Sequence, residues 1–250
     1  MVESVQDIAK RMENIRKNQT TQRDLKTGTN NYMAETVDWD EEIRKQETKE
    51  YQRLSNILEE EKQITFKKAD CKNDTEKKHK KSFENFCRNF EEIKEIGLGI
   101  FMYGECGTGK SYYSVCIMNE LNKEYKVYRT SLFDLLEEIR QTYKKYTDAT
   151  DEYLFKRLKK SDLVIFDDLG NEMITDWGKE KMFLIFEFLY KNRVSFIINT
   201  NLDNKQFQEF LRINGSPKLF DRIRERCKSY KFDWDSRRKD LHKADFERLF

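Results

Sequence analysis

Short apolar runs alternate with amphipathic stretches along this chain from about residue 83 onward. Runs of this length, separated by helical patterns, are typical of buried parallel strands joined by crossover helices. The pattern predicts an α/β domain built on a parallel sheet of at least five strands. The predicted strands are Leu98 to Tyr103, Val127 to Arg129, Leu163 to Phe166, Val194 to Ile198 and Ser229 to Phe232.

The beginning of the chain has a helical rather than a strand period. Val2, Val5, Ile8, Met12 and Ile15 recur at spacings of three and four, which places them on one face of a short amphipathic helix. An apolar face of this kind has to be buried against another surface.

Two further segments separate this helix from the sheet. Residues 17–36 are rich in Asn, Thr and Gln without a clear period, so we expect a linker. A second helix is predicted from Trp39 to Glu61, and its apolar face either packs on its own domain or binds a partner. We therefore expect a small helical N-terminal domain, a partner-binding adaptor with its linker, over residues 1–78, and a catalytic domain over residues 79–250. The sparse apolar face of the second helix consists of Ile43, Tyr51, Leu54, Ile57 and Leu58.

Composition adds limits to this organisation. The chain has 250 residues, and its 48 basic side chains nearly balance its 46 acidic ones, so bulk charge indicates no polyanionic partner. Five cysteines without regular spacing favour a reducing compartment over a disulfide framework. No stretch approaches the roughly 20 apolar residues that cross a bilayer. We expect a cytoplasmic protein with no membrane partner.

One motif carries specific chemistry. The segment from Gly104 to Ser111 matches G-x-x-x-x-G-K-[ST], the phosphate loop or Walker A motif, and it lies between a predicted strand and a predicted helix. Glycines let backbone N–H groups curl around a phosphate, and the start of the following helix favours negative charge. Lys110 would reach the β- and γ-phosphates, and Ser111 would bind Mg²⁺. The nucleotide-binding residues are Gly104, Glu105, Cys106, Gly107, Thr108, Gly109, Lys110 and Ser111.

Two carboxylates follow the apolar run that ends at Phe166. We expect a buried strand to deliver Asp167 to the Mg²⁺ ion, with Asp168 orienting or activating the attacking water. A plain strand end would carry the same residue types. The phosphate loop upstream favours the functional interpretation, and ATP with Mg²⁺ as the bound cofactors.

Two other segments are weaker candidates. The predicted strand from Val194 continues into Asn199, Thr200 and Asn201, whose amides and hydroxyl could contact the γ-phosphate or could form a turn. Residues 143–160 interleave aromatic and basic side chains, a mixture that binds single-stranded DNA but that also suits an amphipathic helix pair.

Zinc and histidine chemistry have less support. Cys71, His79 and Cys87 form no C-x₂-C pair and lack a fourth ligand.

Together these motifs resemble the DnaC/DnaI/IstB branch of AAA+ ATPases. The resemblance rests on the phosphate loop, on Phe166 to Glu172, on Ile197 to Leu202 and on Phe232 to Arg238, and it covers roughly Ser82 to Lys239. It implies an AAA+ P-loop NTPase fold with a five-stranded parallel sheet.

The resemblance also implies roles for several polar residues. Asn201, together with Asn199 in one alternative, would be the sensor-1 residue, and Arg238 the sensor-2 arginine with Arg237 as the second choice. The run from Asp221 to Arg226 would hold the arginine finger that reaches the nucleotide of a neighbouring subunit. Arg222 is the first choice for this finger and Arg226 the second. A fixed guanidinium suits phosphoryl transfer because it neutralises developing charge.

By the same resemblance, the chain is expected to be a slow Mg²⁺-dependent ATPase, stimulated by DNA or a partner, that loads a hexameric replicative helicase onto single-stranded DNA. Self-association through the AAA+ domain would complete its active sites. Two alternatives stay open: a transposition helper of the IstB type, and a nucleotide-dependent adaptor that does not hydrolyse ATP.

Overall fold

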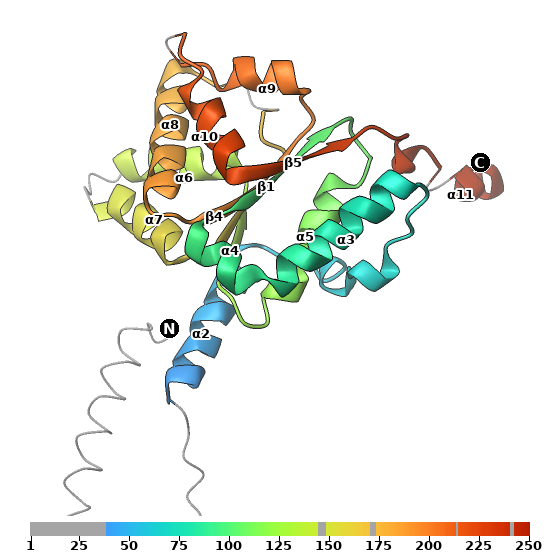
Figure 1. Cartoon of the computed structure of the whole chain (residues 1–250), viewed down its shortest axis with the longest axis horizontal. Coiled ribbons are helices and arrows are strands. Elements are labelled where there is room, and N and C mark those ends of the chain that lie inside the picture. The colour runs from blue at the N-terminus through green and yellow to red at the C-terminus, as the bar shows by residue number, and fades with distance from the viewer. Residues whose placement is uncertain (1–38, 145–148, 171–173, 214, 241–242) are drawn as a thin grey trace, which may run out of the picture. The chain divides into compact units, whose positions relative to one another are not determined.

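The computed structural model describes residues 39–144, 149–170, 174–213, 215–240 and 243–250 (Figure 1). The helix expected over Val2 to Ile15 and the linker expected over residues 17–36 lie outside these ranges. The chain divides into two compact units, Met1–Glu47 and Thr48–Phe250. The boundary expected after residue 78 falls within helix α3 of the second unit, because the residues after Thr48 already pack into its core.

A five-stranded parallel sheet forms the centre of the second unit, as predicted. The spatial order is β2-β3-β4-β1-β5, so β1 lies between β4 and β5. Ile100 of β1 pairs in register with Ile197 of β4 and with Lys228 of β5. The strands are β1 (Gly99–Gly104), β2 (Val127–Thr130), β3 (Leu163–Phe166), β4 (Ser195–Thr200) and β5 (Cys227–Phe232).

Helices cover both faces of the sheet, which gives three layers (Figure 1). Ile100 and Met102 point to the face covered by α3, α4 and α5, whereas Phe101 points to the face covered by α6, α7, α8 and α10. This alternation follows from the two-residue period of a strand. The covering helices are α3 (Asp74–Arg88), α4 (Phe90–Ile96), α5 (Lys110–Leu121), α6 (Leu132–Lys144), α7 (Ala149–Lys160), α8 (Asp176–Lys191) and α10 (Lys218–Arg226).

The remaining elements are short. They are the 3₁₀ turns η2 (Glu61–Gln63), η3 (Phe66–Lys68) and η4 (Arg237–Asp240), and the helices α9 (Asn204–Phe210) and α11 (Lys243–Leu249). Among the described residues, no helix is long and apolar enough to cross a membrane.

The helix that begins at Trp39 ends earlier than the sequence pattern predicts. This helix, α2, ends at Leu54 rather than at Glu61. The helix ends where Asn56 has a φ of 45°, the left-handed conformation that terminates helices. Tyr51 is buried, and its hydroxyl donates a 2.9 Å hydrogen bond to the carbonyl of Arg157. This part of the apolar face therefore packs on its own domain.

Candidate nucleotide-binding site

The phosphate loop connects the end of β1 to the start of α5, as predicted. Gly107 and Gly109 have φ angles of 78° and 102°, which side chains other than glycine rarely adopt. A Cβ atom on Gly107 would lie 2.0 Å from Ser236 Oγ, whereas one on Gly109 would meet nothing within 4 Å. Glycine thus permits the curvature of the loop at both positions and, at Gly107, the close approach of Ser236, whereas Gly109 borders open space.

Lys110 lies across this loop. Its side chain is buried, and Nζ donates hydrogen bonds to the carbonyl oxygens of Gly104 at 2.8 Å and Glu105 at 2.7 Å. Burial lowers the pKa of Lys110, against the opposing effects of Cys106 and the two carboxylates Asp168 and Asp167. Within the described ranges, the hydrogen bonds that hold the ammonium group at the phosphate loop thus go to two backbone carbonyls.

Ser111 and Asp167 meet at the carboxyl edge of the sheet. Ser111 Oγ donates a 2.9 Å hydrogen bond to Asp167 Oδ1. Asn199, which is fully buried on β4 between them, donates through Nδ2 to the same Oδ1 at 2.9 Å and to Ser114 Oγ at 2.8 Å. Asn199 thereby ties the carboxylate that follows β3 to helix α5.

The second oxygen of Asp167 has a cationic partner. Arg129, near the end of β2, places its guanidinium 2.8 Å from Asp167 Oδ2. Burial by itself raises the pKa of Asp167, but the hydrogen bond from Asn199 and the charge of Arg129 outweigh it and leave the pKa below its ordinary value. The carboxylate stays ionised, the state that binds a divalent cation.

Asp168 differs from its neighbour in exposure and backbone conformation. Its side chain is exposed, and its φ of 54° lies in the left-handed region, which is uncommon for a residue other than glycine. Asn201 Nδ2 donates a 3.3 Å hydrogen bond to Asp168 Oδ1. The two asparagines at the end of β4 therefore contact different carboxylates: Asn199 contacts Asp167, and Asn201 contacts Asp168.

The segment after β5 closes over the phosphate loop. Trp234 Nε1 donates a 2.8 Å hydrogen bond to the carbonyl oxygen of Thr108. The backbone N–H of Arg237 donates a 2.9 Å hydrogen bond to the carbonyl oxygen of Gly107. The Arg237 guanidinium binds both carboxylate oxygens of Glu76, which is fully buried.

The adjacent arginine has another position. Arg238 is exposed, and its charge adds a small contribution to the lowered pKa of Lys110, whose main cause is burial. Of the two sensor-2 candidates, Arg237 is paired with Glu76, whereas Arg238 lies beside the phosphate loop.

The arginines proposed as the finger lie on α10. Arg222 pairs with Glu187 and stacks on the Tyr190 ring at 4.8 Å. Arg226 stacks on the same ring at 4.8 Å and donates to the carbonyl of Ile96. In the part of the chain that the structure describes, these contacts are with α8 and α4, and neither arginine joins the cluster around Lys110.

The residues at the loop fit ATP and Mg²⁺. A loop with open space at Gly109 and a lysine at its mouth suits a polyphosphate. A hydroxyl and an ionised carboxylate 2.9 Å apart, Ser111 and Asp167, provide the few oxygen ligands that Mg²⁺ takes from proteins beside phosphate and water.

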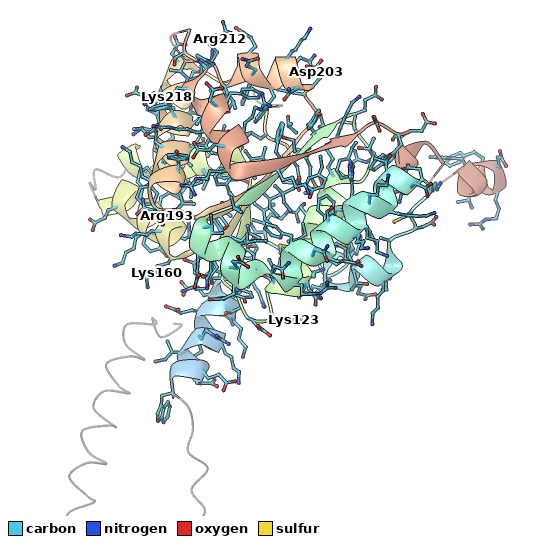
Figure 2. All side chains as sticks on the ribbon, in the orientation of Figure 1. Lys123, Lys160, Arg193, Asp203, Arg212 and Lys218 are labelled. Carbon is cyan, nitrogen blue, oxygen red and sulfur yellow. The ribbon has the colours of Figure 1, made fainter. Side chains whose placement is uncertain are left out.

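The segment of mixed aromatic and basic residues divides between core and surface. The rings of Phe155 and Phe188 pack at a tilt with centroids 4.8 Å apart, and Arg157 is buried beside Glu138 and over the Tyr128 ring. Lys156 and Lys160 are exposed, the latter at the outer end of α7 (Figure 2). Residues 145–148 of this segment lie outside the described ranges.

The residues considered for zinc have other partners. Cys71 Sγ lies 3.4 Å from the Tyr113 hydroxyl, and His79 packs edge-on against Tyr230 at 5.1 Å between ring centroids.

Sequence reasoning missed two charged residues of the site, Arg129 and Glu76. A signal existed for Arg129, because an arginine in a short apolar strand requires a carboxylate partner once it is buried. Glu76 lies in a charged run from Lys67 to Lys81 with nothing to distinguish it from its exposed neighbours.

Comparison with known proteins agrees with this geometry. The family of IstB-like ATP-binding proteins matches residues 7–244. The replicative helicase loader DnaC of Buchnera aphidicola (subsp. Baizongia pistaciae) is 27% identical over 209 residues, which cover 82% of each chain. The helicase loader DnaI of Bacillus subtilis is 28% identical over 98 residues, 39% of this chain and 30% of that protein.

Solved structures match the fold. A crystal structure of the DnaC helicase loader gives a TM-score of 0.61 at 21% identity and covers 70% of this chain and 99% of that chain. The replication initiator DnaA, bound to AMPPCP and single-stranded DNA, gives a TM-score of 0.57 at 20% identity over 77% of this chain and 56% of that chain. The predicted AAA+ fold is confirmed, and this chain belongs to the family of IstB-like ATP-binding proteins.

Proposed function

We propose that this protein is an ATP-dependent loader that delivers a hexameric replicative helicase onto single-stranded DNA. The observation that supports the loader function most directly is the similarity to a DnaC helicase loader over 82% of both chains. The nucleotide dependence is supported by the contact of Ser111 with Asp167 beside the phosphate loop. The protein would act in the cytoplasm, where replication takes place.

In this proposal the chain hydrolyses ATP slowly. Lys110 and the backbone of the phosphate loop bind the phosphates, and Ser111 and Asp167 hold Mg²⁺. The metal, when bound, neutralises charge on the β- and γ-phosphates. Asp168 orients or activates the attacking water, and its 3.3 Å contact with Asn201 connects it to the sensor-1 position. Arg238 beside the loop acts as the sensor-2 arginine.

Assembly completes the site. We assign the arginine finger to Arg222, with Arg226 as the second choice, and their location away from the phosphate loop of their own chain suits action on a neighbouring subunit. Hydrolysis should therefore depend on self-association. A slow ATPase of this kind serves as a switch between states that hold and release the helicase.

The adaptor function is assigned to residues 1–78 and the ATPase function to residues 79–250 in this proposal, although the residues from Thr48 onward also pack into the ATPase unit. Single-stranded DNA would bind the ATPase domain, and residues 143–160 contribute exposed lysines to one candidate surface. Lys156 and Lys160 are the side chains to test there.

The second candidate is a transposition helper of the IstB type. The match of residues 7–244 to the IstB-like family favours it, because this match covers nearly the whole chain. Such a protein shares the nucleotide site and differs in its partner, a transposase on duplex DNA.

The partner distinguishes the two functions. The full chain is mixed, with ATP, with a replicative helicase and separately with a transposase from its own organism, and complexes are separated by size. A loader is expected to retain the helicase in an ATP-dependent manner. The loaded helicase should then displace an oligonucleotide annealed to a single-stranded DNA circle. Retention of the transposase alone would replace the loader with the transposition helper.

A further inference from the structure

A short segment between α2 and η3 contacts the metal-binding edge of the sheet. We call residues 55–64 the connector. Glu61 of the connector accepts a 2.7 Å hydrogen bond from the Arg129 guanidinium through Oε1, while its Oε2 accepts from the Leu58 backbone N–H at 3.0 Å. The other terminal nitrogen of Arg129 binds Asp167 at 2.8 Å. One guanidinium therefore joins the connector to the carboxylate proposed to hold Mg²⁺.

The connector is fixed at both of its ends. Ser55 Oγ accepts from the Arg129 backbone N–H at 3.0 Å and lies 3.2 Å from the Val127 carbonyl, so it satisfies the free edge of β2. Asn119 of α5 donates to the carbonyls of Glu61 at 2.7 Å and Ile64 at 2.8 Å. With its backbone held on both sides, the connector presents Glu61 to Arg129 in one geometry.

Open space lies beside this bridge. A cleft of about 540 Å³ is lined by Leu58, Glu61, Arg129 and Asp167, among others. The side chains of Glu61, Arg129 and Asp167 are 17%, 19% and 15% exposed, so their charges are mostly shielded from solvent and interact strongly. A planar guanidinium that binds two carboxylates through separate nitrogens is a geometry that lysine does not reproduce.

We propose that Arg129 is a positioning residue that couples the Mg²⁺-nucleotide site to the connector. The Arg129 guanidinium is shared between the carboxylates of Asp167 and Glu61. A divalent ion bound to Asp167 neutralises part of the charge of that carboxylate and weakens its attraction for Arg129. Arg129 then pairs more strongly with Glu61. Coupling between two sites is reciprocal. Glu61 must then favour metal binding by drawing Arg129 away from Asp167. This inference rests on the proposed nucleotide site.

The first test measures binding rather than hydrolysis. A fluorescent ATP analogue is titrated into the full chain at a series of Mg²⁺ concentrations and in EDTA. Glu61→Gln should raise the Mg²⁺ concentration for half-maximal tight binding about fivefold and leave affinity in EDTA unchanged. The matched control is Glu59→Gln, a connector carboxylate that is 85% exposed and pairs with Lys62, and it should behave as wild type.

A double-mutant cycle tests the path through Arg129. In an Arg129→Gln background, Glu61→Gln should have no further effect on the Mg²⁺ midpoint, because the bridge is already absent. Arg129→Lys, which keeps the charge and the fold, should lose most of the coupling. An equal shift from Glu61→Gln in the presence and absence of Arg129 would overturn the bridge and leave only through-space charge.

The second readout is hydrogen exchange at the connector amides. The N–H groups of Leu58, Lys62 and Ile64 donate within the connector. Their exchange should slow when Mg²⁺ and the ATP analogue bind to wild type, and should not change in Arg129→Lys. If wild type binds the analogue equally with and without Mg²⁺, the assignment of the Mg²⁺-nucleotide site is wrong, and the coupling proposed from it is wrong as well. If wild type requires Mg²⁺ but Glu61→Gln matches it, only the coupling is wrong.

Discussion

The phosphate-loop edge of the sheet and the arginines of α10 hold their charges in different places. At the loop, Lys110, Asp167 and Arg237 are each bound by a backbone carbonyl or a buried polar group of the same chain. On α10, Arg222 pairs with the buried Glu187, Arg226 donates to the carbonyl of Ile96, and both stack on the Tyr190 ring, so these charges are held by α8 and α4 and not by the loop. Tyr190 lies near the surface, and its hydroxyl donates a 2.9 Å hydrogen bond to the Glu225 carboxylate.

This difference separates two steps of the proposed function. Groups fixed by the interior are preorganised and need no further ordering when phosphates bind. In the described structure neither α10 arginine joins the cluster around Lys110, and in the proposed function both therefore act on another subunit. In that proposal nucleotide binding is a property of one chain, and hydrolysis is a property of the assembly.

The largest expected effect sharpens this separation. Arg222→Lys should reduce hydrolysis by the assembled protein by about a thousandfold, because a finger arginine is worth that much in phosphoryl transfer, while nucleotide affinity stays near the wild-type value. Steady-state phosphate release over a range of protein concentrations measures the first quantity and analogue binding the second.

The matched control is Arg224→Ala, since Arg224 is exposed on the same helix. A large loss in Arg226→Lys but none in Arg222→Lys would transfer the finger to Arg226. If neither substitution affects hydrolysis, the proposed trans-acting arginine is not on this helix.

Asp168→Asn should have the next largest effect. Loss of a group that orients or activates water costs about a hundredfold in rate, whereas the affinity for nucleotide should change little because Asp168 is exposed and Asp167 keeps its own partners. Single-turnover hydrolysis with DNA and helicase present measures the rate. Equal phosphate release by wild type and Asp168→Asn would favour the adaptor that binds ATP without hydrolysing it.

Glu76→Gln tests how strongly the loop edge depends on its buried partners. Glu76 is fully buried, and its carboxylate accepts hydrogen bonds from the Arg237 guanidinium and the Tyr113 hydroxyl. Leaving Arg237 without a counter-charge should cost about 3 kcal/mol, seen as a fall on the order of 10 °C in melting temperature. Asp74→Asn, in an exposed pair on the same helix, is the control. Similar melting temperatures for the two variants would mean that Arg237 is not held as described.

The smallest effect concerns pH. Burial lowers the pKa of His79 from its ordinary 6.5, against the opposing charges of Asp233 and Glu76. Because the unfolded chain binds this proton more readily, the contribution of neutral His79 to stability is present above 6.5 and is lost as the pH falls below that value. Melting curves should therefore show a weaker acid dependence for His79→Phe than for wild type. Parallel pH profiles for the two proteins would exclude this contribution.

Much of the fold was readable from the sequence because its signals are local. Each predicted strand exists, and the run from Leu163 to Phe166 has the predicted bounds, since four apolar residues followed by two carboxylates leave little choice of register. The end of α2 was predicted too late. The left-handed turn at Asn56 depends on the contacts of Ser55 with β2, which are distant in sequence.

The candidate site divides in the same way. The phosphate loop and the Ser111 contact with Asp167 follow from a contiguous motif and the order of strands. The bridge from Glu61 through Arg129 joins residues 68 positions apart, and no single segment encodes it. The sequence also does not show that Arg237 and Arg238 have different surroundings. Only the fold brings Glu76 to Arg237 and leaves Arg238 exposed.

Phosphate release by wild type and by Lys110→Ala, with and without single-stranded DNA and the replicative helicase, shows whether the phosphate loop supports an ATP-dependent function. Lys123→Ala is the control, since Lys123 is exposed in the turn that follows α5, where it pairs with Glu120 (Figure 2). We expect DNA and helicase to stimulate phosphate release in wild type and in Lys123→Ala, and we expect this stimulation to be lost in Lys110→Ala. Stimulated release that Lys110→Ala leaves unchanged would contradict the assignment of the phosphate loop and the ATP-dependent function built on it.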